Sequence, residues 1–284
     1  MAILTLTKQG TAQHAGGSVD LIDSRYAWVR LAISMALGTI GSIGFWGVVV
    51  ILPAVQTEFG VDRADASMPY TLTMAGFAAG NVLFGRYVDR LGIVLPIAAA
   101  AVAMALGFAG AAASTNVWMF ALFQGVFVGV GTAATFGPLI ADVSHWFRRR
   151  RGFAVAACAC GNYIGGTIWP LVVQWLMDTW DWRTAYAVVA VIVIGAMLPM
   201  ALMLRRPAPK EDPAATAAAL AKSSGGNASG QLTIVLSPRM LIIMLSIAGV
   251  ACCVAMSMPQ VHIVAYCFDL GYGAARGAEM LSLM

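Results

Sequence analysis

Residues 85–92 read Gly-Arg-Tyr-Val-Asp-Arg-Leu-Gly, a short charged stretch between two long apolar runs. The run from Ala66 to Gly85 contains no charged residue, and after Arg90 the next charged residue is Asp142. A charged side chain at the centre of a membrane-spanning helix costs about 2.5–3.5 kcal/mol on insertion scales. We therefore expect residues 85–92 to form a turn at a membrane surface, between two spans.

The composition of the chain is that of a membrane protein. Of its 284 residues 60% are hydrophobic and only 11% are charged, against about 25% charged in soluble domains. The basic residues lie in short segments between apolar runs rather than in a stripe, so nucleic acid is not an expected partner. The five cysteines lie in or beside apolar runs without metal-binding spacing. We interpret them as packing residues and expect no metal or other cofactor.

Seven apolar segments are long enough to cross a membrane as helices. The uncharged run from Leu91 to Ala141 is too long for one span, and Ser114-Thr115-Asn116 predicts the break within it. The predicted spans are 31–57, 66–85, the two parts of 91–141, 152–177, 184–204 and 240–268. Three of them contain regularly spaced glycines for close helix contact, at 38, 41, 44 and 47, at 76 and 80, and at 161 and 165.

Four regions follow from this division of the chain. They are a cytoplasmic tail at 1–28, a six-span bundle at 29–204, a cytoplasmic linker at 205–238, and a seventh span with the start of an eighth at 239–284. The linker is rich in Pro, Ala, Ser and Gly, which is typical of a flexible, solvated segment. The last apolar run, 280–284, is far shorter than the ~20 residues of a span. We therefore expect a truncated or partial sequence that is inactive alone.

The basic residues predict the orientation. With the N-terminus in the cytoplasm, 14 of the 17 Lys and Arg residues lie on the cytoplasmic side. The three others are Arg63, Arg183 and Arg276. An excess of Lys and Arg in cytoplasmic segments is the general rule for membrane proteins. We expect a multi-pass protein of a plasma membrane, such as a bacterial inner membrane, with a cytoplasmic N-terminus and the lipid bilayer as its surroundings.

Two connecting stretches resemble those of one transporter family. The pattern Gly85, Asp89, Arg90, Gly92 resembles the loop between spans 2 and 3 of the major facilitator superfamily, except that Ile93 and Val94 stand where the family usually has two basic residues. Residues 142–154, which include Trp-Phe followed by four arginines, resemble the monocarboxylate transporter and oxalate/formate antiporter branch. Residues 58–64, 159–165, 169–170 and 261–264 are also similar to that branch, and the resemblance covers residues 30–284.

The resemblance implies an all-α integral membrane protein with the major facilitator fold, in which this chain supplies the N-terminal six-helix bundle, span 7 and the start of span 8. It implies a secondary transporter of a small organic anion, such as a carboxylate, that works by alternating access with a proton or a counter-anion as coupling partner. It also implies that Asp89 and Arg90 act as a conformational latch. The alternatives are an exporter of amphipathic or drug-like compounds and a non-transporting truncated membrane protein.

An enzyme is not expected, because the three histidines are widely separated and no catalytic constellation appears. Arg148, Arg149, Arg150 and Arg151 are interpreted as topology determinants that contact anionic lipid. In the resembling fold spans 1, 4 and 7 line the cavity, and the charge that binds an anion comes from spans 8 and 11 of the branch. The candidate cavity residues, any of which alone could instead make a helix–helix contact, are Thr39, Ser42, Trp46, Tyr70, Gln124, Asn162, Tyr163, Trp169, Gln260, His262 and Tyr266.

Overall fold

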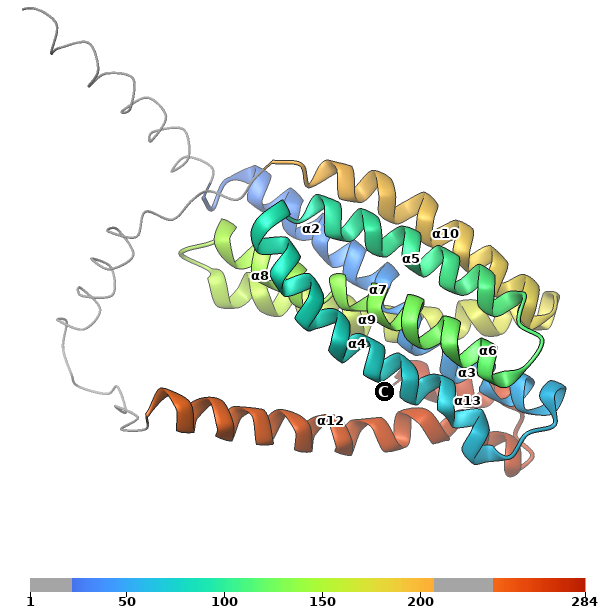
Figure 1. Cartoon of the computed structure of the whole chain (residues 1–284). Helices are drawn as coiled ribbons and strands as arrows, with labels where there is room; N and C mark the ends of the chain where they lie inside the picture. Colours follow the sequence, from blue (N-terminus) through green and yellow to red (C-terminus); the bar gives the residue numbers. More distant parts are fainter. Residues whose placement is uncertain (1–21, 207–236, 284) are drawn as a thin grey trace, which may run out of the picture. The chain divides into compact units, whose positions relative to one another are not determined.

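The computed structural model of the protein describes residues 22–206 and 237–283, which fold into helices joined by short turns (Figure 1). Contacts divide the chain into two compact units, residues 210–260 and the remaining residues, and each unit is described by itself. Most of the predicted tail at 1–28 and of the predicted linker at 205–238 lies outside the described residues. The predicted all-α fold is confirmed for the described part of the chain.

The helices follow the order of the predicted spans. The first span consists of α2 (Arg25–Gly41) and α3 (Ile43–Phe59), the second is α4 (Arg63–Leu91), and the third is α5 (Val94–Ala112). The fourth is built of α6 (Val117–Leu122), the π-helix η1 (Phe123–Gly129), α7 (Val130–Ala134) and α8 (Gly137–Trp146). The fifth and sixth are α9 (Arg151–Thr179) and α10 (Trp182–Met203), and α12 (Pro238–Asp269) and α13 (Ala274–Leu283) come last.

Six helical segments among the described residues are long and apolar enough to cross a membrane. They are 25–59, 94–112, 117–146, 151–179, 182–203 and 239–269. The predicted second span, α4, has 29 residues but is not one of these six segments, because its uncharged stretch contains Ser, Thr, Tyr, Pro and Asn residues and is less apolar. The break predicted at 114–116 is confirmed, and there the Asn116 side chain accepts the Met119 N–H at 2.8 Å and caps α6.

The charged stretch at 85–92 differs from the prediction. α4 continues to Leu91, and the chain turns only at Gly92, whose φ of +75° is one that glycine adopts readily. The Gly92 N–H donates to the Val88 carbonyl at 3.0 Å and closes the helix end. Placing the whole stretch in a turn was wrong, since the end of a long helix tolerates charged residues where it passes beyond the apolar layer. The predicted connection at 142–154 likewise shortens to residues 147–150.

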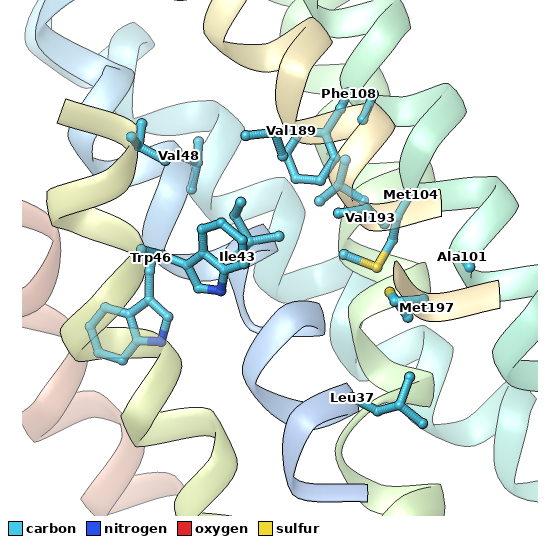
Figure 2. Packing of buried hydrophobic residues seen from close by; sticks show 14 of the residues in the cluster. Leu37, Ile43, Trp46, Val48, Ala101, Met104, Phe108, Val189, Val193 and Met197 are labelled. Carbon is cyan, nitrogen blue, oxygen red and sulfur yellow. The ribbon is translucent and has the colours of Figure 1, made fainter. Parts of the chain in front are cut away.

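The contact between α5 and α10 is the most extensive helix pair of the larger unit. Figure 2 shows Met104 and Phe108 of α5 close to Val189, Val193 and Met197 of α10. All five side chains are buried. The two helices are therefore joined by a continuous set of buried apolar side chains.

Glycines bring α4 against the fourth span. A Cβ at Gly80 would lie 2.8 Å from the Val130 carbonyl oxygen, and one at Gly129 would lie 2.5 Å from the Thr73 carbonyl oxygen. Because these neighbours are backbone atoms, the two helices could not come this close with a larger residue at either position. The predicted pair Gly76 and Gly80 therefore does form a helix contact. Gly76 lies against Gly125 of η1, and Gly80 lies against Val130 of α7.

A second glycine contact joins α2 to α9. A Cβ at Gly161 would lie 2.5 Å from the Met35 carbonyl oxygen, and one at Gly165 would lie 2.7 Å from the Thr39 carbonyl oxygen. The predicted pair Gly161 and Gly165 thus sets the distance between the first and fifth spans. We call this contact the α2–α9 seam.

The end of α12 and α13 belong to the same unit as the first six spans. α13 packs against α9, and a Cβ at Gly277 of α13 would lie 2.7 Å from the Cα of Val264 in α12. Close contact at a small residue is again the means of packing.

We predict that Gly161→Ala destabilises the protein by about 1–3 kcal/mol, the usual cost of inserting an extra carbon into a packed interior. The added methyl would press on the Met35 backbone, so α2 would have to move. The control is Gly195→Ala in α10, where nothing lies within 4 Å of the added carbon. Alanine is the better helix former by about 1 kcal/mol, so the control should unfold at the same temperature or a higher one. Thermal unfolding in detergent gives the unfolding temperature of both variants. Equal shifts of this temperature would contradict the close helix contact at the α2–α9 seam.

Candidate functional site

Three of the predicted cavity residues hydrogen-bond one another within the α2–α9 seam. The Trp169 indole N–H donates to the Thr39 carbonyl oxygen at 2.6 Å, and the Ser42 hydroxyl donates to the same oxygen at 2.8 Å. The Thr39 hydroxyl lies 2.9 Å from the Gly161 carbonyl oxygen and 3.0 Å from that of Met35. These groups satisfy one another across the seam, as polar groups between membrane helices do, and their donors are engaged.

Trp46, Asn162 and Tyr163 are placed differently. The Trp46 ring lies against α9, because a Cβ at Gly166 would come within 2.7 Å of its ring carbons. Its indole nitrogen is buried and has no acceptor among the described residues. Asn162 is half-buried on α9, and the Tyr163 side chain beside it is 54% exposed. An unmade hydrogen bond at a buried donor costs about 1–3 kcal/mol, so the Trp46 N–H is a group that a ligand or a water molecule would stabilise.

Gln124 connects three spans. Its side-chain amide nitrogen donates to the Gly44 carbonyl oxygen of α3 at 3.1 Å, and the Tyr186 hydroxyl of α10 donates to its oxygen at 3.4 Å. Gln124 is fully buried and lies in the π-helix η1. Tyr70, another predicted cavity residue, is buried in α4. A π-helical turn frequently marks a functional position, but both polar ends of the Gln124 amide are used within the bundle.

The predicted residues of α12 are divided between the two units, with His262 and Tyr266 in the larger one. His262 is exposed and borders a cavity of about 20 Å³, which holds no more than a water molecule. Arg63, which also borders this cavity, pairs with Asp269 at 2.5 Å. Tyr266 is largely exposed, and Gln260 belongs to the other unit, where it is half-buried.

The loop-motif residues lie at the end of α4. Gly85 is helical and has open space where a side chain would be, while Gly92 makes the turn. Arg90 is exposed and forms no ion pair with a described acidic side chain. Asp89 is in the last turn of α4, and its carboxylate lies outside the described side chains. The role of Asp89 and Arg90 as a conformational latch therefore stays a prediction.

A buried ion pair joins the first span to the fourth. Arg30 is 1% exposed, and its guanidinium donates to both carboxylate oxygens of Asp142, at 2.7 and 2.9 Å. It also donates to the carbonyl oxygens of Leu204 and Arg206 at 3.2 and 3.0 Å, and its Cζ lies 4.5 Å from the centre of the Trp146 ring. A paired arginine with further hydrogen bonds is the form in which proteins tolerate a buried charge. We call the side of the bundle that contains this pair the Arg30 end.

The Arg30–Asp142 pair was not found from the sequence. Arg30 was assigned to the edge of a span and Asp142 to a loop, and the two are 112 residues apart in the chain. The feature of the sequence that could have indicated the pair is that Arg30 and Asp142 each border a long uncharged run. In an alternating topology these two positions lie on the same side of the membrane, but their pairing depends on which helices are neighbours.

Another arginine ties the helices at the opposite side, the Arg183 end. Arg183 pairs with Glu58 at 2.6 Å and donates to the carbonyl oxygens of Ala112 and Ser114, each at 2.7 Å. The Trp182 indole N–H donates to the other carboxylate oxygen of Glu58. The end of α3, the end of α5 and the start of α10 are thereby held together.

The four arginines at 148–151 lie in the connection between α8 and α9, at the Arg30 end. All four are exposed. The Arg149 backbone N–H donates to the Asp23 carboxylate at 3.1 Å, and the Arg151 side chain donates to the Ser144 hydroxyl at 3.2 Å. The remaining guanidinium groups face outward, which is compatible with their predicted contact with anionic lipid.

We predict that Asp142→Asn destabilises the protein by about 3–5 kcal/mol, because it leaves the Arg30 charge buried without its partner. The double variant Arg30→Met, Asp142→Leu should recover most of this loss, since replacing a buried pair by apolar residues is often neutral. Unfolding of the purified variants in detergent compares them. If the single variant were as stable as the unchanged protein, the pair would not be a buried interaction.

Comparison with known proteins relates this arrangement to a family. The family model described as Major Facilitator Superfamily matches residues 34–284. Monocarboxylate transporter 6 of Mus musculus is 28% identical over 202 residues, which is 69% of this chain and 43% of that protein. The Fujikurins efflux protein of Gibberella fujikuroi is 30% identical over 142 residues, 49% of this chain and 30% of that protein.

Solved structures show the same fold. A crystal structure of the peptide transporter POT in complex with alafosfalin matches with a TM-score of 0.56 at 16% identity, and covers 89% of this chain and 55% of that one. A second, in complex with sulfate, matches with a TM-score of 0.55 at 15% identity. The chain thus spans less than half of the two curated relatives named above and about half of these structures. The match over residues 34–284 and the shared fold show that the chain belongs to the major facilitator superfamily, a family of multi-pass membrane transporters.

Proposed function

We propose that the protein is a secondary transporter that moves a small organic anion, such as a carboxylate, across the membrane by alternating access. The observation that carries this proposal is the similarity to monocarboxylate transporter 6 over 69% of the chain. A second relative named as a monocarboxylate transporter, number 11 of Homo sapiens, is 27% identical over 68% of the chain. A proton or a counter-anion is the proposed coupling partner.

The chemistry of the described spans supports an anionic substrate. Charged residues of the first six spans lie near the helix ends, as Arg30 and Arg183 do, and none lies in the middle of a helix. The middle offers neutral donors instead, chiefly the Trp46 N–H and the Asn162 and Tyr163 side chains of α9. In this family two bundles rock around a site between them. We propose that these neutral donors orient the substrate, while its charge is met by a cation elsewhere in the site.

Export of an amphipathic compound is the second candidate function. It is favoured by the similarity to the Fujikurins efflux protein over 142 residues. An apolar compound would also suit spans without internal charge. The two functions differ in whether transport saturates with a carboxylate.

We predict saturable uptake of labelled carboxylates into proteoliposomes that contain the complete transporter to which this chain belongs, driven by an inward proton gradient or by an internal counter-anion. Trp46→Phe should raise the apparent KM roughly tenfold, because a hydrogen bond to a charged group is worth about 1.5–3 kcal/mol. Trp175→Phe is the control, since Trp175 lies on α9, the helix against which the Trp46 ring packs, but is 61% exposed. Transport of lipophilic compounds alone would support the exporter instead, and equal KM values for the two variants would exclude Trp46 from the site.

We also propose that the Arg30 end is cytoplasmic, because Arg25, Arg86, Arg90, the 148–151 cluster and Arg205 gather there. In a variant without native cysteines, Arg148→Cys should react with an impermeant thiol reagent only after the membrane is opened. Asp62→Cys, at the exposed start of α4, should react in intact cells. The reverse pattern would show that the N-terminus is outside.

A further inference from the structure

A large cavity opens at the Arg30 end and is not used by the proposed transport site. Its volume is about 640 Å³, within the range of small-molecule sites. It is bordered by the start of α2, the end of α4, the start of α5, α8 and the segment that follows α10. Five separate parts of the chain thus form its wall.

Two arginines with exposed side chains border the cavity. They are Arg205 and Arg206, and neither forms an ion pair with a described acidic side chain. Asp142 also borders it, but its carboxylate is bound on both oxygens by Arg30. The acidic group among the described side chains of the wall is therefore already paired. The guanidinium groups of Arg205 and Arg206 are exposed to an anion, and the Cζ of Arg206 lies 4.8 Å from the centre of the Tyr26 ring.

The start of α5 adds to this charge. Gly92, Ile93 and Val94 border the cavity, the Ile93 position has no side-chain cap, and the first turn of α5 contains no acidic residue. The N-terminal end of a helix carries a partial positive charge and free N–H groups. Two guanidinium groups lie beside the N-terminal end of α5. Together they favour an anion whose oxygens can accept several hydrogen bonds, such as a phosphate ester.

The rest of the wall is apolar. Val88, Leu91 and Leu204 border the cavity, and Leu91 is more than half exposed. A ligand that fits this wall combines a phosphate group with hydrocarbon. Free phosphate would leave most of the volume and all of the apolar wall uncontacted.

We propose that this cavity binds the phosphate headgroup of an anionic phospholipid, with Arg205 and Arg206 as its charge partners. The lipid lies at the surface end of the bundle, where α2, α4, α5 and α10 terminate. It bridges the segment after α10 to the turn between α4 and α5. The site is independent of the transported substrate.

The test compares two double variants of the full 284-residue chain by native mass spectrometry, with phosphatidylglycerol titrated into detergent. Arg205→Gln, Arg206→Gln should weaken lipid binding roughly tenfold, since two basic residues near the headgroup are lost. Arg25→Gln, Arg86→Gln removes the same charge at the same end but does not border the cavity, and it should change binding by less than about twofold. Both pairs are exposed, so the unfolding temperature should not change.

Equal loss of lipid in the two double variants would overturn the proposal, because binding would then follow total charge. A second titration uses soluble glycerol phosphate in place of the lipid. If it displaces phosphatidylglycerol at similar concentrations, the hydrocarbon contributes nothing and the lipid assignment is wrong. The proposal is supported if only Arg205→Gln, Arg206→Gln loses phosphatidylglycerol binding and glycerol phosphate does not displace the lipid.

Discussion

The bundle depends on hydrogen-bond donors for the backbone carbonyl groups near the ends of its helices. The last four carbonyls of a helix have no partner within it, and little water is present to bind them beside a membrane. Arg30 donates to the carbonyls that follow α10, and Arg183 donates to those at the end of α5. α5 and α10 form the most extensive helix contact of the larger unit, and the two arginines bind at opposite ends of this contact.

Arg30 and Arg183 also join the α5–α10 pair to the first span. Arg30 is itself in α2, and Arg183 pairs with Glu58 at the end of α3. The two seams made by glycine complete the arrangement, one between α2 and α9 and the other between α4 and the fourth span. In a half built from inverted three-span repeats, spans 1 and 5 correspond to spans 4 and 2. The α2–α9 seam and the contact between α4 and the fourth span therefore join corresponding spans of the two repeats.

Much of this fold could be predicted from the sequence because lipid makes apolar length informative. The break at 114–116 and the glycine pairs at 76 and 80 and at 161 and 165 were predicted correctly. The ends of helices were predicted less well, since charged residues are compatible with a helix that projects beyond the apolar layer, and α4 runs to Leu91 for this reason. The Arg30–Asp142 pair could not be predicted, because neighbouring spans are chosen by packing and not by order in the chain.

The roles of the polar residues in the candidate site were also hard to predict from the sequence. A polar residue in a span indicates that a hydrogen bond is needed, but not whether its partner is a helix or a substrate. Thr39, Ser42 and Trp169 meet one another, and Gln124 meets Gly44 and Tyr186. These residues stiffen the bundle. Only a group left without a partner in a well-packed interior can distinguish the two roles.

Trp46 is such a group, and its position would allow a rigid bundle to take part in the proposed binding. Its ring packs against α9 at Gly166, so its position is fixed by the same helix contact that holds the first span in place. Its N–H is left unpaired. A donor that is already held in position loses little entropy on binding a ligand. In a transporter whose halves move as rigid bodies, such a donor would keep its direction while access changes from one side of the membrane to the other.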